Sequence, residues 1–172
     1  MSGDMSTDNS PASDPFSQTG WPGFRARYFH LYFMLPRPMT LGARGVVFDR
    51  AANAVFLIEH TYVPGWQLPG GGVEPGETML EALTRELMEE GNIELSAPPV
   101  LKSLHHNRHA SRRDHVAVYL VTEFRQTAPH VPDREIKAAG FFALDALPEN
   151  TTPGTRRRIE EVLRGADASA WW

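Results

Sequence analysis

The most constraining feature of the sequence is a glycine triplet followed by a stretch that contains no helix-breaking residue. Residues 70–72 are all glycine, and residues 77–90 lack glycine and proline and are rich in strong helix formers, which predicts a helix. At about 100° per residue, Glu86, Glu89 and Glu90 share one face near the end of this helix. The residues expected to form the adjacent apolar stripe against the core are Leu80, Leu83 and Leu87.

This placement of three carboxylates is unfavourable by local rules. Like charges three or four residues apart cost about 0.2–0.5 kcal/mol per pair, and the last turn of a helix prefers cations. Arg85 is the only cationic side chain in residues 77–97. A bound cation would offset the repulsion, and hard carboxylate oxygens suit Mg²⁺, Mn²⁺ or Ca²⁺. The alternative is an acidic helix face that is simply solvated.

The spacing of the acidic residues matches a known motif. Gly71, five residues, Glu77, seven residues, the run Arg-Glu-Leu-Met-Glu-Glu from residue 85 and then Ile93 together resemble the Nudix box. The resemblance covers residues 71–93. Asn92 stands where the family has glycine. Asparagine is the next most favourable residue for the left-handed conformation that often ends a helix, so the exchange leaves the carboxylates in place.

The resemblance implies a fold, a cofactor and a set of site residues. The implied fold is α/β, a Nudix-type α/β/α sandwich with a mixed β-sheet. The implied cofactor is Mg²⁺ or Mn²⁺. The implied metal ligands are the Gly71 carbonyl, Glu86, Glu89 and Glu90. The implied catalytic residues are Arg85, Glu86, Glu90 and, more loosely, Glu135. The residues implied to hold the shape of the motif are Glu77, which with Arg85 braces the helix and loop, Gly72 and Gly76.

The function implied by the resemblance is divalent-metal-dependent hydrolysis of a pyrophosphate bond in a nucleoside diphosphate linked to another moiety, by attack of water on phosphorus. Nucleotide sugars and nucleoside triphosphates are rival substrates. The alternatives are a non-catalytic Nudix nucleotide-binding sensor or scaffold and an RNA 5′-end pyrophosphohydrolase. The presence of Glu77, Arg85 and all three later carboxylates favours catalysis over the sensor.

Several residues outside the motif are candidates for contacts with substrate, each with a structural alternative. Arg44 lies on an expected strand and either pairs with phosphate or faces solvent. His60, Tyr62 and Trp66 precede the glycines, and Trp66 either stacks on a base or caps the core. Glu135 is either a further acid of the site or a surface residue beside its arginine neighbour. The basic, histidine-containing region 105–113 either meets phosphates or is solvated.

Two N-terminal regions differ in composition from the rest. Residues 1–20 are rich in Ser, Asp and Pro and have no Lys or Arg, which predicts a disordered tail. Residues 21–172 are expected to form a single Nudix-type domain. Within it, apolar residues between 24 and 35 recur at helical spacing, which favours a short helix over a strand. The aromatic segment 21–38 is expected to pack on the domain or on a second copy, so a homodimer stays open.

The expected order of elements beyond residue 38 is mostly β. Strands are predicted at residues 39–48, 54–61, 100–107, 115–124 and 136–144, the first two joined as a hairpin through 49–53. Residues 62–72 are predicted to be a loop because they are dense in proline and glycine. A final helix is predicted over 153–163, with Pro153 in its first turn and Gly165 past its end.

Composition limits the classes of partner and compartment. The chain of 172 residues has no cysteine, so it needs no oxidising compartment, which fits the cytoplasm. No apolar run approaches the roughly 20 residues of a membrane span, so no membrane partner is expected. The formal net charge of −4 argues against long nucleic acid as a partner and favours a small-molecule nucleotide substrate, although a short RNA end remains open.

Overall fold

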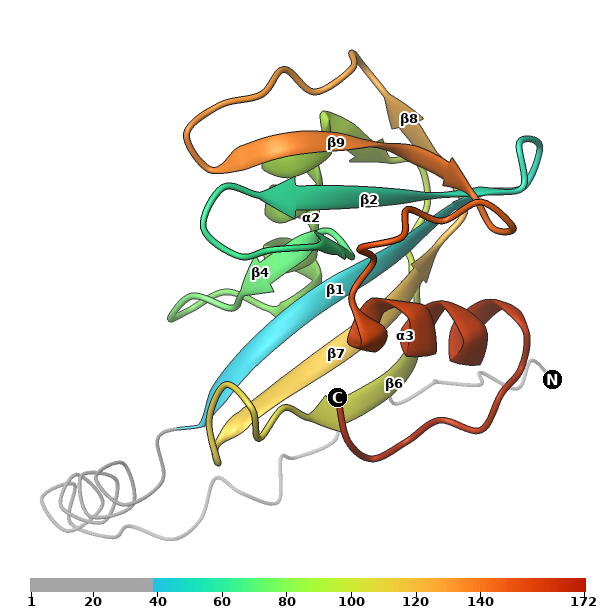
Figure 1. Cartoon of the computed structure of the whole chain (residues 1–172). Helices are drawn as coiled ribbons and strands as arrows, with labels where there is room; N and C mark the ends of the chain where they lie inside the picture. The colour runs from blue at the N-terminus through green and yellow to red at the C-terminus, as the bar shows by residue number, and fades with distance from the viewer. Residues whose placement is uncertain (1–38) are drawn as a thin grey trace, which may run out of the picture. The chain divides into compact units, whose positions relative to one another are not determined.

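The computed structural model describes residues 39–172; the predicted tail 1–20 and the aromatic segment 21–38, with its predicted short helix, lie outside the described residues. The described chain is drawn in Figure 1. Its elements are β1 (Thr40–Asp49), β2 (Ala54–His60), β3 (Trp66–Gln67), β4 (Gly70–Gly72), α2 (Met79–Gly91), β5 (Ile93–Leu95), β6 (Val100–His106), β7 (Asp114–Val121), β8 (Phe124–Gln126), β9 (Ile136–Ala143) and α3 (Pro153–Leu163).

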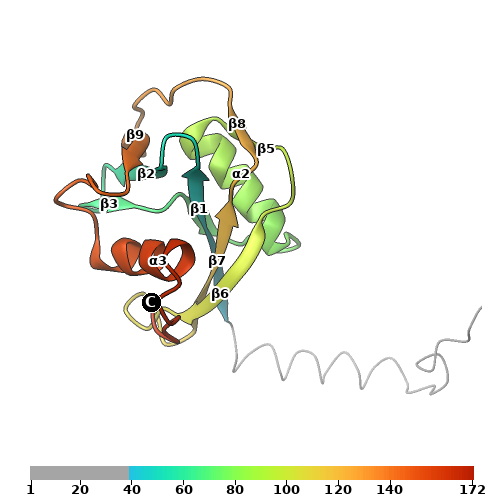
Figure 2. The ribbon, with the colours of Figure 1, turned by 90° about the vertical axis from the view of Figure 1, so that its right-hand side faces the viewer.

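The centre of the fold is a seven-stranded mixed sheet built around β1. β1 runs parallel to β7 and antiparallel to β2 and β4. The main path is β3-β2-β1-β7-β6, with β9 beside β2 and β4 beside β1. β5 and β8 form a separate antiparallel pair next to the C-terminal end of α2, as Figure 2 shows. The mixed sheet predicted from the resemblance is therefore confirmed.

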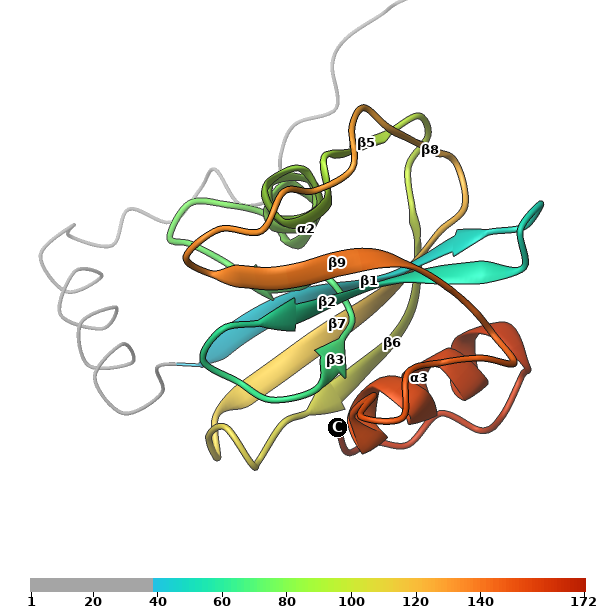
Figure 3. The same ribbon diagram turned by 45° about the horizontal axis from the view of Figure 1, so that its top comes forward.

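The two helices cover opposite faces of the sheet, which makes the α/β/α sandwich visible in Figure 3. Successive strand residues point to opposite faces. Along β2, Phe56 and Ile58 accordingly join the core beneath α2, and Val55 and Leu57 join the core beneath α3. The α2 core also contains Ala43, Val47, Leu83, Leu87, Ile93, Val121 and Ile136. The α3 core also contains Val46, Leu68, Val118, Ile159 and Val162.

The long strands and both helices lie close to their predicted bounds, but four short strands were not predicted. β3 and β4 lie inside residues 62–72, which the sequence predicts as a loop. β5 and β8 are also short, with three residues each. Such segments carry too few residues for a period-2 signal. They become strands because a partner strand already lies beside them.

Local signals set both ends of α2. Thr78 caps the N-terminus and forms a capping box with Glu81, so the helix begins at Met79 rather than at residue 77. Asn92 ends it in the left-handed conformation, with φ of 52°, and its N–H donates to the Leu87 and Met88 carbonyls. This is the conformation expected for a residue in the place of the family glycine.

The apolar stripe of α2 was predicted correctly only in part. Leu83 and Leu87 are fully buried, whereas Leu80 is 40% exposed. Leu80 lies in the first turn, before the part of the helix that packs on the sheet, and the buried stripe begins instead at Ala82. Within residues 39–172, no helix is long and apolar enough to cross a membrane.

Candidate functional site

Five carboxyl groups surround one hollow of about 390 Å³, here called the acidic hollow. Three come from α2 and two from the segment that leads into β9. The hollow is lined by Glu86, Glu89, Glu90, Asp133 and Glu135, together with Ile136. The structure thus brings the three predicted helix carboxylates together with the predicted Glu135 and adds Asp133, which the sequence interpretation missed.

Glu90 is the most deeply placed of these acids, with 5% of the residue exposed. The Gly70 backbone N–H donates to Glu90 Oε2 across 2.6 Å, and His60 Nε2 lies 3.8 Å from Oε1. Burial raises the pKa of Glu90 to about 8, against the opposing charge of Arg44 and the hydrogen bond from Gly70. A cation beside Glu90 would favour its ionised form and offset the cost of burying that charge.

Arg85 joins α2 to the glycine-containing loop. Its Nε donates to Glu77 Oε1 at 3.1 Å, and its Nη2 donates to the Gly72 carbonyl at 3.2 Å. Its Nη1 donates to Glu86 Oε1 at 2.7 Å and to Glu89 Oε2 at 3.3 Å. Of these carboxylates, Glu77 first and then Glu86 raise the pKa of Arg85 and keep it charged. The predicted brace between Arg85 and Glu77 is thus present as a set of contacts.

The loop before α2 is held by Glu77. The Glu74 N–H donates to Glu77 Oε2 at 2.9 Å, so one carboxylate links the loop backbone to the Arg85 guanidinium. These hydrogen bonds, that of Arg85 first, lower the pKa of Glu77. Gly76 turns the chain into the helix with φ of +89°, a conformation that side chains rarely adopt.

Gly71, whose carbonyl is a predicted ligand, lies in the short strand β4 next to Glu86. It pairs with Ala43 in the β1–β4 ladder, and its carbonyl oxygen lies on the β1 side, 3.3 Å from where a Cβ on Gly42 would stand. A Cβ on Gly71 itself would overlap the carboxylate of Glu86. The absence of a side chain at Gly71 therefore leaves the space that Glu86 occupies. The ligand role of the Gly71 carbonyl stays a prediction.

Glu135 enters the acidic hollow on a turn fixed by Asp133. Asp133 Oδ1 accepts the N–H groups of Glu135 and Ile136 at 2.8 and 2.7 Å, which lowers the pKa of Asp133. The Tyr62 hydroxyl donates to Glu135 Oε1 at 3.2 Å. An aspartate capping its own turn just before a strand is a recognisable sequence signal. The sequence alone could not place that turn opposite α2.

The donor set fits a hard divalent cation. All five groups are carboxyl oxygens, and they come from two sides of one hollow. Within residues 39–172, no three acidic or histidine side chains already converge at metal-binding distances. The physical reason is visible in the contacts of Arg85, which holds Glu86 and Glu89 to itself. A cation would compete with this arginine for the same oxygens.

A second and larger hollow, here called the large cleft, has a volume of about 550 Å³ and lies along the N-terminal half of β1, from Thr40 to Arg44. It is within the size range of small-molecule sites. Gly71 and Gly72 of β4 are part of its lining, and the Glu86 carboxylate lies where a Cβ on Gly71 would stand. Its lining also includes Thr40, Arg44, Leu68, His109, Asp114 and Trp172.

The predicted substrate contacts fall in three different environments. Arg44 lines the large cleft and donates from Nη1 to the Leu68 carbonyl at 3.1 Å. His60 is buried beside Glu90, and burial lowers the pKa of His60. Trp66 packs edge to face on Phe142 at 4.6 Å against the α3 core, which is the structural alternative that the sequence left open. Of the three, Arg44 is the one that lines a hollow described above.

The comparisons with known proteins agree with this geometry. Residues 39–162 match the family model of the NUDIX domain. An RNA pyrophosphohydrolase of Rhodopseudomonas palustris is 45% identical over 56 residues, which cover 32% of this chain and 32% of that protein. The NAD-capped RNA hydrolase NudC of Pectobacterium carotovorum is 30% identical over 123 residues, which cover 69% of this chain and 45% of that protein.

A solved structure is similar to this chain over a longer stretch. The crystal structure of a MutT NUDIX hydrolase from Burkholderia pseudomallei aligns with a TM-score of 0.62 at 30% identity, over 73% of this chain and 99% of that one. The chain spans less than half the length of the two curated relatives named above. The family model nevertheless covers residues 39–162, and the solved relative matches over nearly its full length. The chain therefore belongs to the Nudix family.

Proposed function

We propose that the protein hydrolyses a pyrophosphate bond in a nucleoside diphosphate linked to another moiety, with Mg²⁺ or Mn²⁺ as cofactor. The single observation that carries this proposal is the acidic hollow, where a buried Glu90 and four further carboxyl groups open beside the glycines of β4. Holding several ionised carboxyl groups close together, one of them buried, costs free energy unless a cation is bound. Their oxygens suit a divalent cation that also contacts phosphate.

The residues of the two hollows have complementary tasks in this proposal. Glu86, Glu89 and Glu90 hold the cation from α2. When bound, that cation neutralises phosphate charge and makes a bound water more acidic. Arg44 binds the substrate phosphates, because it lines the large cleft and its planar guanidinium suits phosphate oxygens. Arg85 keeps α2 and the loop in register and is a positioning residue.

The reaction balances with water as the only co-reactant. The water oxygen forms a bond to one phosphorus, and the bridging P–O bond breaks with its electron pair going to the departing phosphate. The proton released by the water goes to a carboxylate of the acidic hollow. Glu86, Glu90 and Glu135 are the candidates, and Glu135 reaches the hollow from the side opposite α2.

A substrate panel tests the proposal directly. The purified chain is incubated with nucleotide sugars, nucleoside triphosphates, dinucleoside polyphosphates and 5′-triphosphorylated RNA, with Mg²⁺, with Mn²⁺ or with a chelator. Metal-dependent release of a nucleoside monophosphate or of pyrophosphate is the expected result. Binding of a nucleotide without any turnover would favour the non-catalytic sensor instead.

Two finer expectations belong to the same proposal. A cytoplasmic location is supported by the absence of cysteine from the sequence, and fractionation of cells tests it. A homodimer would involve the aromatic segment 21–38, and light scattering on the full chain decides between one copy and two. A small-molecule nucleotide remains the expected partner.

A further inference from the structure

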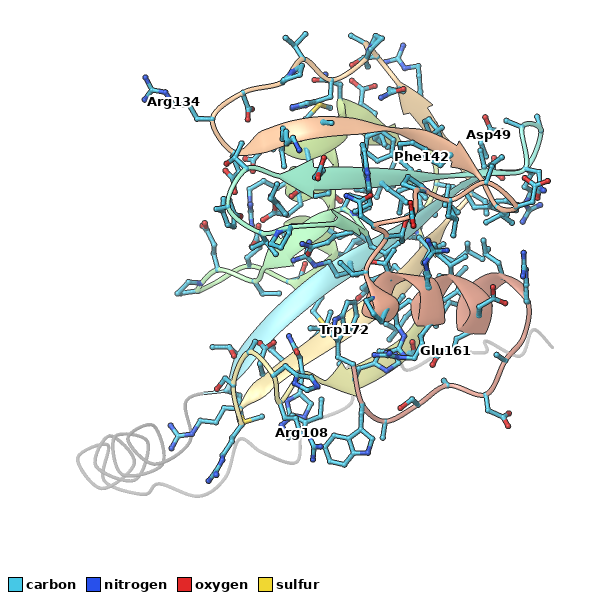
Figure 4. All side chains as sticks on the ribbon, in the orientation of Figure 1. Asp49, Arg108, Arg134, Phe142, Glu161 and Trp172 are labelled. Carbon is cyan, nitrogen blue, oxygen red and sulfur yellow. The ribbon has the colours of Figure 1, made fainter. Side chains whose placement is uncertain are left out.

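A surface rich in cations and aromatic rings adjoins the large cleft at the end far from the acidic hollow. It is formed by the end of β6, the loop to β7 and the segment after α3, and Arg108 is labelled there in Figure 4. We call it the outer surface. Its members are His106, Arg108, Arg112, Arg113, His115 and Trp171.

The rings of the outer surface lie close to one another, with His106 and His115 stacked and Trp171 tilted by 39° to His106. The Arg108 guanidinium lies 5.1 Å from the centre of the Trp171 ring, and Trp171 is 52% exposed. The His106 ring lies 5.3 Å from Trp171 and stacks on His115 at 5.0 Å and 12°. Exposed aromatic faces beside cations are the combination that binds the bases and phosphates of single-stranded nucleic acid.

The cations of the outer surface lack acidic partners. Among residues 39–172, no carboxylate lies within ion-pair distance of Arg108, Arg112 or Arg113. The nearest acid of the loop, Asp114, is occupied by hydrogen bonds from Thr40 and Asn107 at 2.8 Å each. The positive charge of this surface is therefore available to an anion.

The large cleft runs along β1 between the acidic hollow and the outer surface, so its direction determines which part of a bound substrate lies near the outer surface. Along β1, Arg44 pairs with Gly70 at the end next to the acidic hollow, and Thr40 pairs with Asp114 at the other end. Four strand residues span about 13 Å, close to the length of one nucleotide. A nucleotide with its phosphates at Arg44 places its nucleoside towards His109 and Trp172, at the edge of the outer surface.

We propose that the outer surface binds the second nucleotide of a short 5′-phosphorylated single strand, with its base on Trp171 and the linking phosphate on Arg108. This inference rests on the proposed function, because it places the reacting phosphates at the acidic hollow. A second nucleotide joined through the ribose of the first extends towards the outer surface. The second nucleoside of a dinucleoside polyphosphate is joined through the phosphates, so it lies on the side of the acidic hollow and points away from the outer surface.

The test compares substrates that differ by one nucleotide. KM and kcat are measured with Mg²⁺ for 5′-triphosphorylated mononucleotides, for the matching 3′-extended dinucleotides as RNA and as DNA, and for dinucleoside tetraphosphates. The extension should lower KM about tenfold, the effect of stacking one base on an aromatic side chain. Dinucleoside tetraphosphates should gain nothing over the mononucleotide.

Variants of Trp171 separate recognition from folding. Trp171→Ala should raise KM for the dinucleotide about tenfold and leave KM for the mononucleotide unchanged, and Trp171→Tyr should restore the wild-type value. The backbone of Trp171 accepts from Arg158 Nη1 through its carbonyl, a contact that neither exchange removes, so the melting temperature should hold. Arg164→Ala is the matched control, since Arg164 is exposed and pairs with Glu160 on α3.

The salt dependence of KM is a second measurement, and a change in packing alone would not alter it. Arg108→Gln should reduce the slope of log KM for the dinucleotide against log salt by about 0.7, the value for one contact to a single strand. Equal KM values for mononucleotide and dinucleotide in the wild type, or equal losses on both in Trp171→Ala, would overturn the inference while the proposed function stands. Failure to hydrolyse any compound would overturn the proposed function and the inference with it.

Discussion

The Gly70 backbone N–H donates to Glu90 Oε2 across 2.6 Å and so ties the glycine strand β4 to the last turn of α2. Gly70 adopts φ of +130°, and a Cβ there would overlap the Ala43 carbonyl, so β4 reaches this position only as glycine. The contact holds one oxygen of the buried carboxyl group and leaves the other towards His60. The glycine triplet and the helix carboxylates are therefore one unit.

Glu90→Gln tests whether this carboxyl group acts through its charge. The amide oxygen can still accept from Gly70, but a neutral group cannot hold a cation as a carboxylate does. We expect kcat at saturating Mg²⁺ to fall about 100-fold, and the melting temperature to stay level because no buried charge is left behind. Glu94→Gln, which alters an exposed partner of Arg125, is the control. An unchanged kcat in Glu90→Gln would remove Glu90 from the site.

Gly71→Ala and Gly72→Ala form a matched pair of neighbouring exchanges. A Cβ at Gly71 would overlap the Glu86 carboxylate, whereas a Cβ at Gly72 would meet nothing within 4 Å. We expect Gly71→Ala to fold, because only the flexible end of Glu86 must move, and to lose about 10–100-fold in metal-dependent turnover. Gly72→Ala should keep wild-type rates. Steady-state kinetics and circular dichroism measure both, and equal activity in the two variants would contradict the assignment.

Arg85→Lys asks whether the planar fork of arginine is needed to brace the loop. Arg85 contacts Glu77, Glu86, Glu89 and the Gly72 carbonyl at once, which one ammonium group cannot reproduce. We expect Mg²⁺ affinity, measured by calorimetry, to weaken about 10-fold while the domain remains folded. Retention of wild-type affinity by the lysine variant would show that charge alone is sufficient there.

Leu83→Ala and Leu80→Ala test the corrected stripe of α2. Leu83 is fully buried in the core between α2 and the sheet, and its truncation should cost about 2–5 kcal/mol of unfolding free energy. Leu80 is 40% exposed, and its truncation should cost less than about 1 kcal/mol. Urea denaturation measures both values. Similar losses for the two variants would restore the stripe expected from the sequence.

The dependence of stability on pH should include a contribution from His105. Burial, with the charge of Arg158, lowers the pKa of His105 below 6.5, so the unfolded chain takes up the proton before the folded chain does. The contribution is present above pH 6.5 and is lost as pH falls through the folded-state pKa. His60 acts in the same direction, and Glu90, with its raised pKa of about 8, acts oppositely.

His105→Gln isolates that contribution. The difference in unfolding free energy between wild type and variant should shrink as pH falls from 7.5 through 6.5 and below, because only the wild type then protonates this site. Urea denaturation at a series of pH values gives the difference directly. A difference that stays constant with pH would show that His105 does not titrate on unfolding.

Much of the site could be predicted from the sequence because its residues lie close together in the chain. Glu86, Glu89 and Glu90 share a helix, and helical periodicity alone fixes their common side. Glu77 and Arg85 are eight residues apart, so the loop and the first turns of α2 bring them together. The left-handed end at Asn92 followed from the same local reasoning.

Only the tertiary structure determined which residues from distant parts of the sequence complete each hollow. Asp133 and Glu135 face α2 across more than 40 residues of chain, and Trp172 reaches the large cleft because the segment after α3 returns to β6. The orientation of the Gly71 carbonyl and the packing of Trp66 likewise depend on partner strands. Short-range periodicity determines which residues share a face of one element, but contacts between elements depend on how the whole core packs.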